Sequence, residues 1–434
     1  MKKLLAIILT IFMAFSASGC GIFLEDNDQL LRSPTPGGEY EEITEVLSEE
    51  LTSGYTLKYA KYGDLRSAFI VSDLDSDGEE DEALVFYSTT SDGNETLNIS
   101  LFEKENEWKM MGKTAVGGTD IEKLELGDID SDGNLEAVIG WSIYGAPETR
   151  LSVFNLSGDI PISIYESKYS AYTVYDMNAD GKENLLICDI DTPSNTVKFS
   201  LHEFQKGTMT KIAECDADKS LTSVRRFVKS KVGGHPAVFV DASLGMDAYF
   251  TELIYFDGKQ LSAPLYEQSG QTHSLTMRFN DIPSQDIDLD GDIDIPCQSL
   301  LPGAEDGEKS LYLTTWKSYS GDKLKTTERS IISASMQYRF KVKKSWVGAF
   351  TAVSSASDGM IFYNYSADKG RGEELFELRY SSLENADDDE AGAIYSDETS
   401  VATLRIYSKD SEMDVDHDAI KKRFEKMNQI GDKK

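Results

Sequence analysis

Basic side chains are scarce in this chain of 434 residues, which has 43 Lys and Arg against 76 Asp and Glu and a formal net charge of −33. A surface with such an excess of carboxylates repels both nucleic-acid phosphates and anionic lipid headgroups. The composition therefore argues strongly against nucleic-acid binding and against electrostatic docking on a membrane. It suits a protein that needs divalent cations in order to be compact.

Histidine and cysteine are also few, with four of each. Neither a His-x-x-x-His pair nor a Cys-x-x-Cys pair occurs, so the common zinc-binding patterns are missing. The three cysteines other than Cys20 do not specify a disulfide scaffold. The chain also has no Gly-x-Ser-x-Gly elbow and no phosphate-binding glycine loop. No motif therefore supports catalysis, and we expect no enzymatic activity.

Only one long apolar run occurs, at residues 4–15, and it follows two lysines. Such a short run with a basic flank is typical of a signal peptide and too short for a spanning helix. The residues leading to Cys20 resemble a bacterial lipobox, although Ala17 stands where leucine is usual. This resemblance implies a signal peptide over residues 1–19, a lipid on Cys20 and anchoring at the outer face of the cell membrane. The alternative is an ordinary secretory signal, and the protein is exported in either case.

What the chain does contain is an acidic loop that occurs four times. Oxygen-bearing side chains stand at positions 1, 3, 5 and 9, and a glycine stands at position 6. Ca²⁺ takes about 6–8 oxygen ligands, and the glycine permits the bend with positive φ that such a compact loop needs. The candidate calcium ligands are Asp73, Asp75, Asp77 and Asp81; Asp128, Asp130, Asp132 and Glu136; Asp176, Asn178, Asp180 and Asn184; and Asp286, Asp288, Asp290 and Asp294.

An EF-hand is the obvious alternative for these loops. It requires a glutamate at position 12 and a helix after the loop. Position 12 falls here on Leu84, Ile139, Ile187 and Cys297, and the following residues are β-branched and apolar. Both the EF-hand and the dockerin type, which shares the 12-residue loop, are therefore excluded.

The spacing of the loops indicates a repeat. They begin at Asp73, Asp128, Asp176 and Asp286, and the last interval is about twice as long as the other two. A further loop is therefore missing near residue 231, although the apolar run that should follow it is present at 237–240. Each repeat divides into four short strands with the loop between the first and the second. A period of about 40–55 residues made of short strands is typical of a β-propeller.

The repeat of Asp-x-Asp-x-Asp-Gly-x-x-Asp/Glu followed by an apolar strand resembles the FG-GAP/VCBS repeat of integrin-α-like propellers. The resemblance covers residues 66–330, and the 176 loop departs from it at Asn178 and Asn184. It implies a mainly β fold, a propeller of four-stranded blades with Ca²⁺ bound structurally at the blade corners. Five repeats are countable, and five to seven blades are expected. One way to close the ring of blades is for a strand at 55–62 to complete the last blade.

The expected organisation has four parts. A helix is expected over residues 40–52, a strand at 275–279 opens the fifth repeat, and an amphipathic helix ends the chain at 419–430. The four parts are a signal peptide (1–19), a tether (20–40), a β-propeller (41–332) and a small α+β domain (333–434). The alternative for the last part is a final blade with a tail.

These features predict a membrane-anchored, calcium-binding lipoprotein that acts as a binding module for a glycan or an envelope protein. A cation cage filled with protein oxygens leaves no open position for substrate, so the ion is expected to brace the corner between two strands. The alternatives are a polysaccharide-processing enzyme that uses dispersed acidic residues, and a purely structural envelope scaffold.

Overall fold

The computed structural model is mainly β. It describes residues 38–427 apart from 52–53, 92, 146–147, 246, 334–337, 356–358, 383–391, 398–399, 410–412 and 414. The expected signal peptide, the expected lipid attachment at Cys20 and nearly all of the expected tether therefore lie outside the described residues. Within the described part, no helix has both the length and the apolar character for crossing a bilayer.

The strands of the described residues form six antiparallel sheets, which we number 1 to 6. Sheet 1 contains β1 (Thr56–Leu57), β2 (Phe69–Ser72), β3 (Glu82–Ser91), β4 (Asn94–Lys104) and β5 (Trp108–Val116). Sheet 2 contains β6 (Asp120–Gly127), β7 (Glu136–Ser142), β8 (Thr149–Asn155) and β9 (Ile162–Lys168). Sheet 3 contains β10 (Ala171–Tyr175), β11 (Asn184–Asp191), β12 (Thr196–Gln205) and β13 (Thr208–Asp216).

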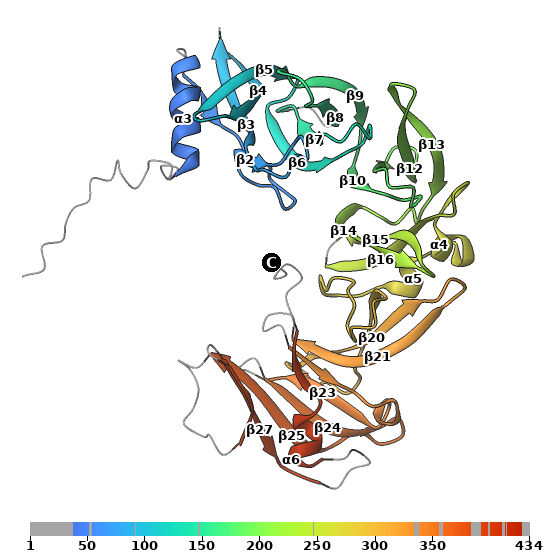
Figure 1. The fold of residues 1–434 in the computed structure, drawn as a ribbon. Helices are drawn as coiled ribbons and strands as arrows, with labels where there is room; N and C mark the ends of the chain where they lie inside the picture. Colours follow the sequence, from blue (N-terminus) through green and yellow to red (C-terminus); the bar gives the residue numbers. More distant parts are fainter. Residues whose placement is uncertain are drawn as a thin grey trace, which may run out of the picture.

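The second half of the chain continues the pattern. Sheet 4 contains β14 (Ser223–Val232), β15 (His235–Gly245), β16 (Ala248–Phe256) and β17 (Leu261–Ser262). Sheet 5 contains β18 (Asp294–Leu300), β20 (Tyr312–Tyr319), β21 (Leu324–Ser333), β22 (Tyr338–Lys341) and β28 (Phe424–Lys426). Sheet 6 contains β19 (Lys309–Ser310), β23 (Phe350–Ser354), β24 (Met360–Ser366), β25 (Gly370–Ser382), β26 (Ala393–Ser396) and β27 (Ser400–Ile406). The six sheets follow one another along an arc in chain order (Figure 1).

The strands β3, β7, β11 and β15 of sheets 1 to 4 are mostly apolar, as expected of strands buried on both faces. Successive side chains of a strand point to opposite faces. In β7, Ala137 and Ile139 pack with residues of sheet 1, whereas Val138 packs with residues of sheet 3. In β15, Val238 packs with sheet 3 and Phe239 with sheet 5. Sheets 2 and 4 are therefore each packed face to face between their two neighbours.

The helix expected at 40–52 is confirmed as α3 (Glu39–Glu50). Its buried residues Ile43 and Leu47 join a cluster with Tyr87, on the face of β3 that points away from sheet 2. Figure 1 shows α3 standing against this first end of the arc. The amphipathic helix thus covers a face on which no sheet of the described residues packs.

The strand expected at 55–62 is much shorter, and its predicted role is wrong. It is present as β1, which pairs with β3 inside sheet 1. An isolated parallel bridge joins Tyr62 to Lys123 farther along. Because β1 and β2 occupy the same edge of β3, this segment belongs to the first sheet and does not complete the last one.

The missing loop of the fourth repeat is replaced by a tight turn. β14 pairs directly with β15 from Val232 opposite His235, and the two residues between them are Gly233 and Gly234. Both glycines have positive φ, which such a two-residue hairpin turn favours. The strand pair therefore survives without the acidic loop, as the sequence predicted.

The strand expected at 275–279 is not formed. The chain instead makes two short helices, α4 (Pro264–Ser269) and α5 (His273–Thr276). The Thr276 hydroxyl donates to the Thr251 carbonyl oxygen at 2.9 Å and accepts the Thr251 N–H at 3.1 Å. These bonds tie α5 to β16, so this segment attaches to sheet 4 and leaves sheet 5 without a first strand.

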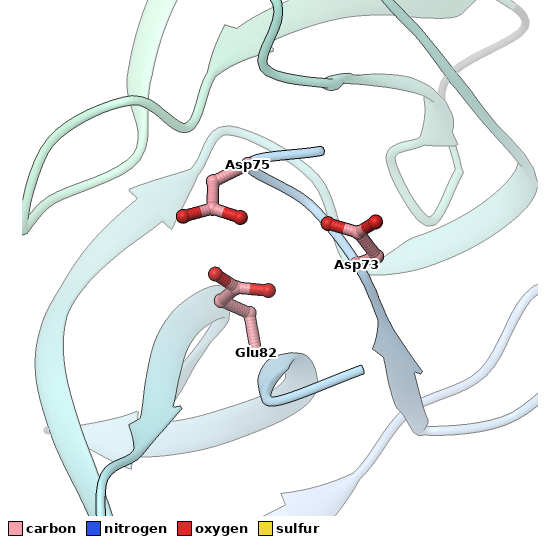
Figure 2. A group of neighbouring side chains, drawn as sticks. All are labelled: Asp73, Asp75 and Glu82. Atoms are coloured by element: carbon pink, nitrogen blue, oxygen red, sulfur yellow. The ribbon is translucent and has the colours of Figure 1, made fainter. Parts of the chain in front are cut away.

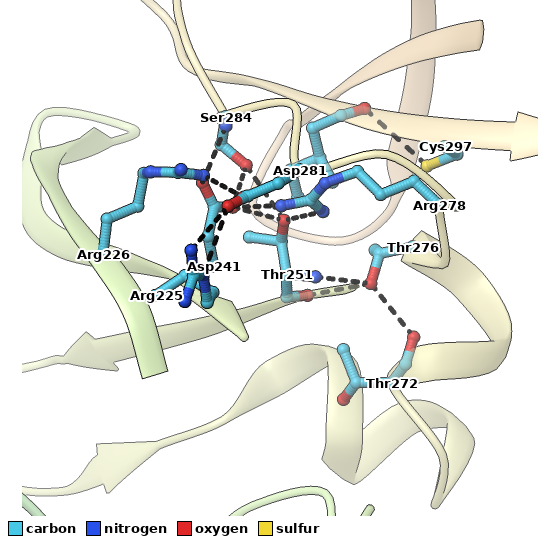
Figure 3. A network of polar contacts seen from close by, with 11 residues as sticks. Arg225, Arg226, Asp241, Thr251, Thr272, Thr276, Arg278, Asp281, Ser284 and Cys297 are labelled. Atoms are coloured by element: carbon cyan, nitrogen blue, oxygen red, sulfur yellow. Dashed lines mark hydrogen bonds and ion pairs between the residues drawn. The ribbon is translucent and has the colours of Figure 1, made fainter. Parts of the chain in front are cut away.

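A buried polar network joins the chain after α5 to sheet 4 (Figure 3). The Arg278 and Asp241 side chains are both fully buried and form an ion pair at 2.9 Å. Arg278 also donates to the Thr251 hydroxyl at 2.9 Å, and the Asp241 carboxylate accepts the Ser284 N–H and hydroxyl at 2.9 and 2.7 Å. Arg226 pairs with Asp241 at 3.4 Å. The segment between α5 and β18 is therefore fixed to sheet 4 through a buried charged centre.

The C-terminal region differs from the prediction of a long terminal helix at 419–430. α6 (His417–Lys421) is short, and β28 follows it and pairs with β22. The ring of Phe424 stacks on that of Tyr338 with centroids 5.0 Å apart, and this long-range contact favours strand over helix. Residues 428–430 lie outside the described part. The described residues after 333 are mainly β with one short α-helix.

Candidate metal centres

The acidic loops lie at equivalent places in sheets 1, 2, 3 and 5, directly before β3, β7, β11 and β18. The residue that opens this strand lies opposite the residue directly before the loop. The pairs are Glu82 with Ser72, Glu136 with Gly127, Asn184 with Tyr175 and Asp294 with Gln285. Strand pairing therefore fixes the two ends of each loop.

The side chain that opens the strand also holds its loop in the same way in all four cases. One of its oxygens accepts the backbone N–H of the second loop residue. The bonds are Leu74 to Glu82 (3.1 Å), Ile129 to Glu136 (2.8 Å), Met177 to Asn184 (3.0 Å) and Ile287 to Asp294 (3.3 Å).

The glycine at position 6 has the expected conformation. Gly78, Gly133, Gly181 and Gly291 have φ of 98°, 97°, 86° and 96°. In three loops the N–H of this glycine donates to the first aspartate, from Gly78 to Asp73 (3.0 Å), Gly181 to Asp176 (3.0 Å) and Gly291 to Asp286 (2.9 Å). The chain folds back in each loop and turns the aspartates inward.

Three of the four loops bring carboxylates together closely enough to hold one metal ion. The groups are Asp73, Asp75 and Glu82; Asp128, Asp130 and Glu136; and Asp286, Asp288 and Asp290, with ligand oxygens in each group within 4.8 Å of one another. Figure 2 shows the first group, with the three carboxylates turned toward a common point. Within the described residues, no Lys or Arg forms an ion pair with any of these nine side chains.

The first group contains Glu82 where the sequence predicted Asp81. This loop is one residue longer than the others, so counting nine positions from Asp73 stops one residue short of β3. Asp81 instead uses its carbonyl oxygen to accept the Lys104 N–H at 2.9 Å. Aligning the loops on the following strand, Glu82-Ala83 with Glu136-Ala137, would have identified the correct residue.

The other predicted ligands lie in the loops but outside the three groups. Asp77 and Asp132 are exposed and accept the N–H groups of Glu79 (2.9 Å) and Asn134 (2.8 Å). Asp294 is buried, and its Oδ1 accepts the Thr327 hydroxyl at 2.5 Å. These three residues shape the loops in the structure.

Burial makes ionisation of the strand-opening acids costly. It raises the pKa of Glu82 to about 7, that of Glu136 to about 7 and that of Asp294 to about 6, with neighbouring aspartates adding to the rise. Burial also raises the pKa of Asp130. A cation between such carboxylates favours their ionised form and offsets this cost.

The 128 loop has the most enclosed group. Glu136 is fully buried, and its Oε2 accepts the N–H groups of Ile129 and Asp130 at 2.8 and 3.1 Å. Oδ1 of Asp128 is buried without a hydrogen-bond partner, as expected of an oxygen meant for a cation. The sequence reasoning missed Asn155 of β8, which donates to Asp130 and Glu136 at 3.1 Å each and holds both carboxylates in place.

The 176 loop lacks a comparable group because two of its positions carry amides. The buried Asn184 accepts the Met177 N–H through Oδ1, which leaves its Nδ2 buried and without a hydrogen-bond partner. An amide nitrogen is a donor and does not bind cations. Its loop conformation is nevertheless the same, held by Asp176 and Asn178 as acceptors of the Asp180 N–H at 3.3 and 3.1 Å.

Asn184→Asp is therefore expected to create a cation site in the 176 loop. The new oxygen would replace the unpartnered amide nitrogen, so titration calorimetry should show one more bound Ca²⁺ per chain. In EDTA the variant should be less stable by about 1–3 kcal/mol, because it buries an uncompensated charge. Asn195→Asp is the matched control, since it adds the same charge at an exposed turn of sheet 3. Equal stoichiometry in the two variants would contradict the assignment.

Comparison with known proteins adds little to this description. No protein-family model matches the chain, and no curated protein matches it. Three solved structures are similar: a protein from Lactobacillus plantarum (10% identity over 74% of this chain and 94% of that one, TM-score 0.34), the exotype rhamnogalacturonan lyase YesX (11%, 74% and 83%, 0.30) and Saccharomyces cerevisiae Sqt1 (9%, 81% and 100%, 0.34). With TM-scores at this level, these likenesses carry no argument about function. The resemblance to FG-GAP/VCBS repeats stays a prediction.

Proposed function

We propose that this protein is a calcium-stabilised β-propeller that serves as a binding module outside the cell. The observation that carries the proposal is the convergence of carboxylates at equivalent corners of sheets 1, 2 and 5. Ca²⁺ fits these loops better than Mg²⁺, because it accepts many oxygen ligands in flexible geometry, whereas Mg²⁺ demands a small octahedron and retains water.

The sheet arrangement supports the propeller. Successive antiparallel sheets, three of them with four strands, pack face to face along an arc, with the acidic loops at one recurrent position. Each of the six sheets is a blade in this proposal, within the expected range of five to seven. Sheet 6 is then the final blade, built from the chain that the sequence analysis assigned to a separate domain.

The ions act as braces and leave binding to other surfaces. The proposed ligand is a glycan or an envelope protein. The lipid on Cys20 would anchor this protein at the outer face of the membrane, where it meets that ligand. Two tryptophans that could have lined a sugar-binding face are instead buried, with Trp141 donating to Ser152 and Trp316 to Ser330, both at 2.9 Å. Tyr144 remains exposed and is available for ligand contact.

Calcium titration calorimetry on the chain carrying Cys20→Ser tests the proposal. Three bound ions per chain are expected from the three carboxylate groups. Asp130→Ala combined with Glu136→Ala should remove one of them, and Mg²⁺ should bind more weakly. A chain that binds no Ca²⁺, or a double variant with unchanged stoichiometry, would overturn the proposal.

A further inference from the structure

Two candidate cation loops on neighbouring sheets are in direct contact. The backbone N–H of Leu135, in the 128 loop, donates to the carbonyl oxygen of Leu74, in the 73 loop, at 2.7 Å. Leu74 is buried, and the half-buried Leu135 packs in the same apolar cluster. The loops of sheets 1 and 2 are therefore joined by a backbone hydrogen bond inside an apolar contact.

This hydrogen bond joins two residues that are each adjacent in sequence to candidate ligands of their own loop. Leu74 lies between Asp73 and Asp75, and its own N–H donates to Glu82 at 3.1 Å. Leu135 directly precedes Glu136. A movement that draws the first group around an ion therefore moves the peptide that holds the second group.

The next loop along the arc touches its neighbour at the same position. Glu183 directly precedes Asn184, and its carboxylate faces the backbone N–H of Asp128 in the 128 loop. The contact is close enough that a Cβ on Gly127 would lie 2.0 Å from Glu183 Oε2. In sheets 2 and 3, the residue directly before the strand-opening residue therefore contacts the acidic loop of the preceding sheet. These residues are Leu135 and Glu183.

The 286 loop has a different neighbour. Sheet 4, which precedes it, has the turn at Gly233 and Gly234 in place of an acidic loop. The carbonyl oxygen of Ile287, equivalent to that of Leu74, instead accepts a hydrogen bond from the buried Arg339 guanidinium at 2.9 Å. Of the three carboxylate groups, two therefore lie in loops that contact each other, and the third lies in a loop whose Ile287 carbonyl is capped by the Arg339 side chain.

We propose that Leu135 is a positioning residue that couples the 73 and 128 loops, so that these two bind Ca²⁺ cooperatively while the 286 loop binds independently. This inference rests on the proposed function. Binding at either loop orders the Leu74 and Leu135 peptides, which one hydrogen bond joins. The second ion then binds to a loop that is already ordered. By reciprocity, each ion raises the affinity for the other by the same factor.

Three variants of the Cys20→Ser chain separate the sites. Asp288→Ala with Asp290→Ala leaves the 73 and 128 loops, whereas Asp130→Ala with Glu136→Ala leaves the 73 and 286 loops. All four substitutions together leave the 73 loop alone. Calcium titration of the first variant should give a Hill coefficient above 1, with a midpoint at least about 2-fold below that of the 73 loop alone, as a coupling of about 5-fold between two equal sites implies. The second variant should titrate as two independent sites.

An unchanged affinity of the 73 loop after loss of the 128 loop would overturn the coupling while leaving calcium binding intact. A chain that binds no calcium at all would instead overturn the proposed function and the coupling with it. Leu135→Pro removes the connecting N–H without touching a carboxylate and should abolish the cooperativity. If that variant fails to fold, the three site deletions still decide the outcome.

Discussion

Excess EDTA is expected to lower the thermal unfolding midpoint by about 10 °C relative to the protein in millimolar Ca²⁺. A ligand at about 100 times its Kd stabilises a fold by about 2.7 kcal/mol per site, and three carboxylate groups are present. An unfolding entropy of about 2.1 cal/mol/K per residue converts this sum into a shift of roughly 10 °C for a chain of this length. Circular dichroism at the β-sheet band can follow the transition.

Variants distinguish binding at the loops from a general effect of the salt. Asp130→Ala with Glu136→Ala should reduce the calcium-dependent shift by at least about a third, because one of three sites is lost and the 73 loop loses its coupled partner. Asp159→Ala is the matched control, since Asp159 is exposed and outside the loops. If calcium shifts the midpoint equally in both variants, the stabilising ions do not sit in the 128 loop.

Asp241→Ala is expected to destabilise the protein by about 3–5 kcal/mol, because the substitution leaves the fully buried Arg278 guanidinium without its counter-charge. The Thr251 and Ser284 hydroxyls would also lose their carboxylate acceptor. Urea unfolding, followed by fluorescence, measures the change in the free energy of unfolding.

Two further variants test whether the cost comes from the unpaired charge. Arg225→Ala should cost less than about 1 kcal/mol, since Arg225 is half exposed and pairs with Asp281 at the surface. Replacing the pair together, as Arg278→Met with Asp241→Leu, should restore much of the stability lost in Asp241→Ala. A double variant no more stable than the single one would show that hydrogen bonding, and not charge, dominates at this centre.

The sequence predicted the acidic loops because their chemistry is local. Oxygen ligands and a glycine within nine residues can be recognised without knowing the fold, and so can the apolar strand that follows. Glu82 was missed because its place depends on the pairing of β2 with β3 and not on distance from Asp73. The one-residue insertion is visible only when the strands are aligned.

Elsewhere the outcome depends on contacts between distant residues. The segment 419–430 has a helical pattern, but Phe424 meets Tyr338, some eighty positions earlier, and becomes part of a strand. Arg278 and Asp241 carry no motif, and only the fold brings them together. The helix α5 forms where a strand was expected to begin, and Thr276 makes its hydrogen bonds with Thr251 of sheet 4.

The position of α3 has a consequence for self-association. A series of sheets packed face to face is open-ended in principle, and contact between the last sheet of one molecule and the first sheet of another would propagate into a fibre. The outer face of sheet 1 carries Tyr87 and Phe102, side chains suited to such a contact, but α3 lies over them. A twelve-residue segment thus covers the apolar face through which such a contact would form.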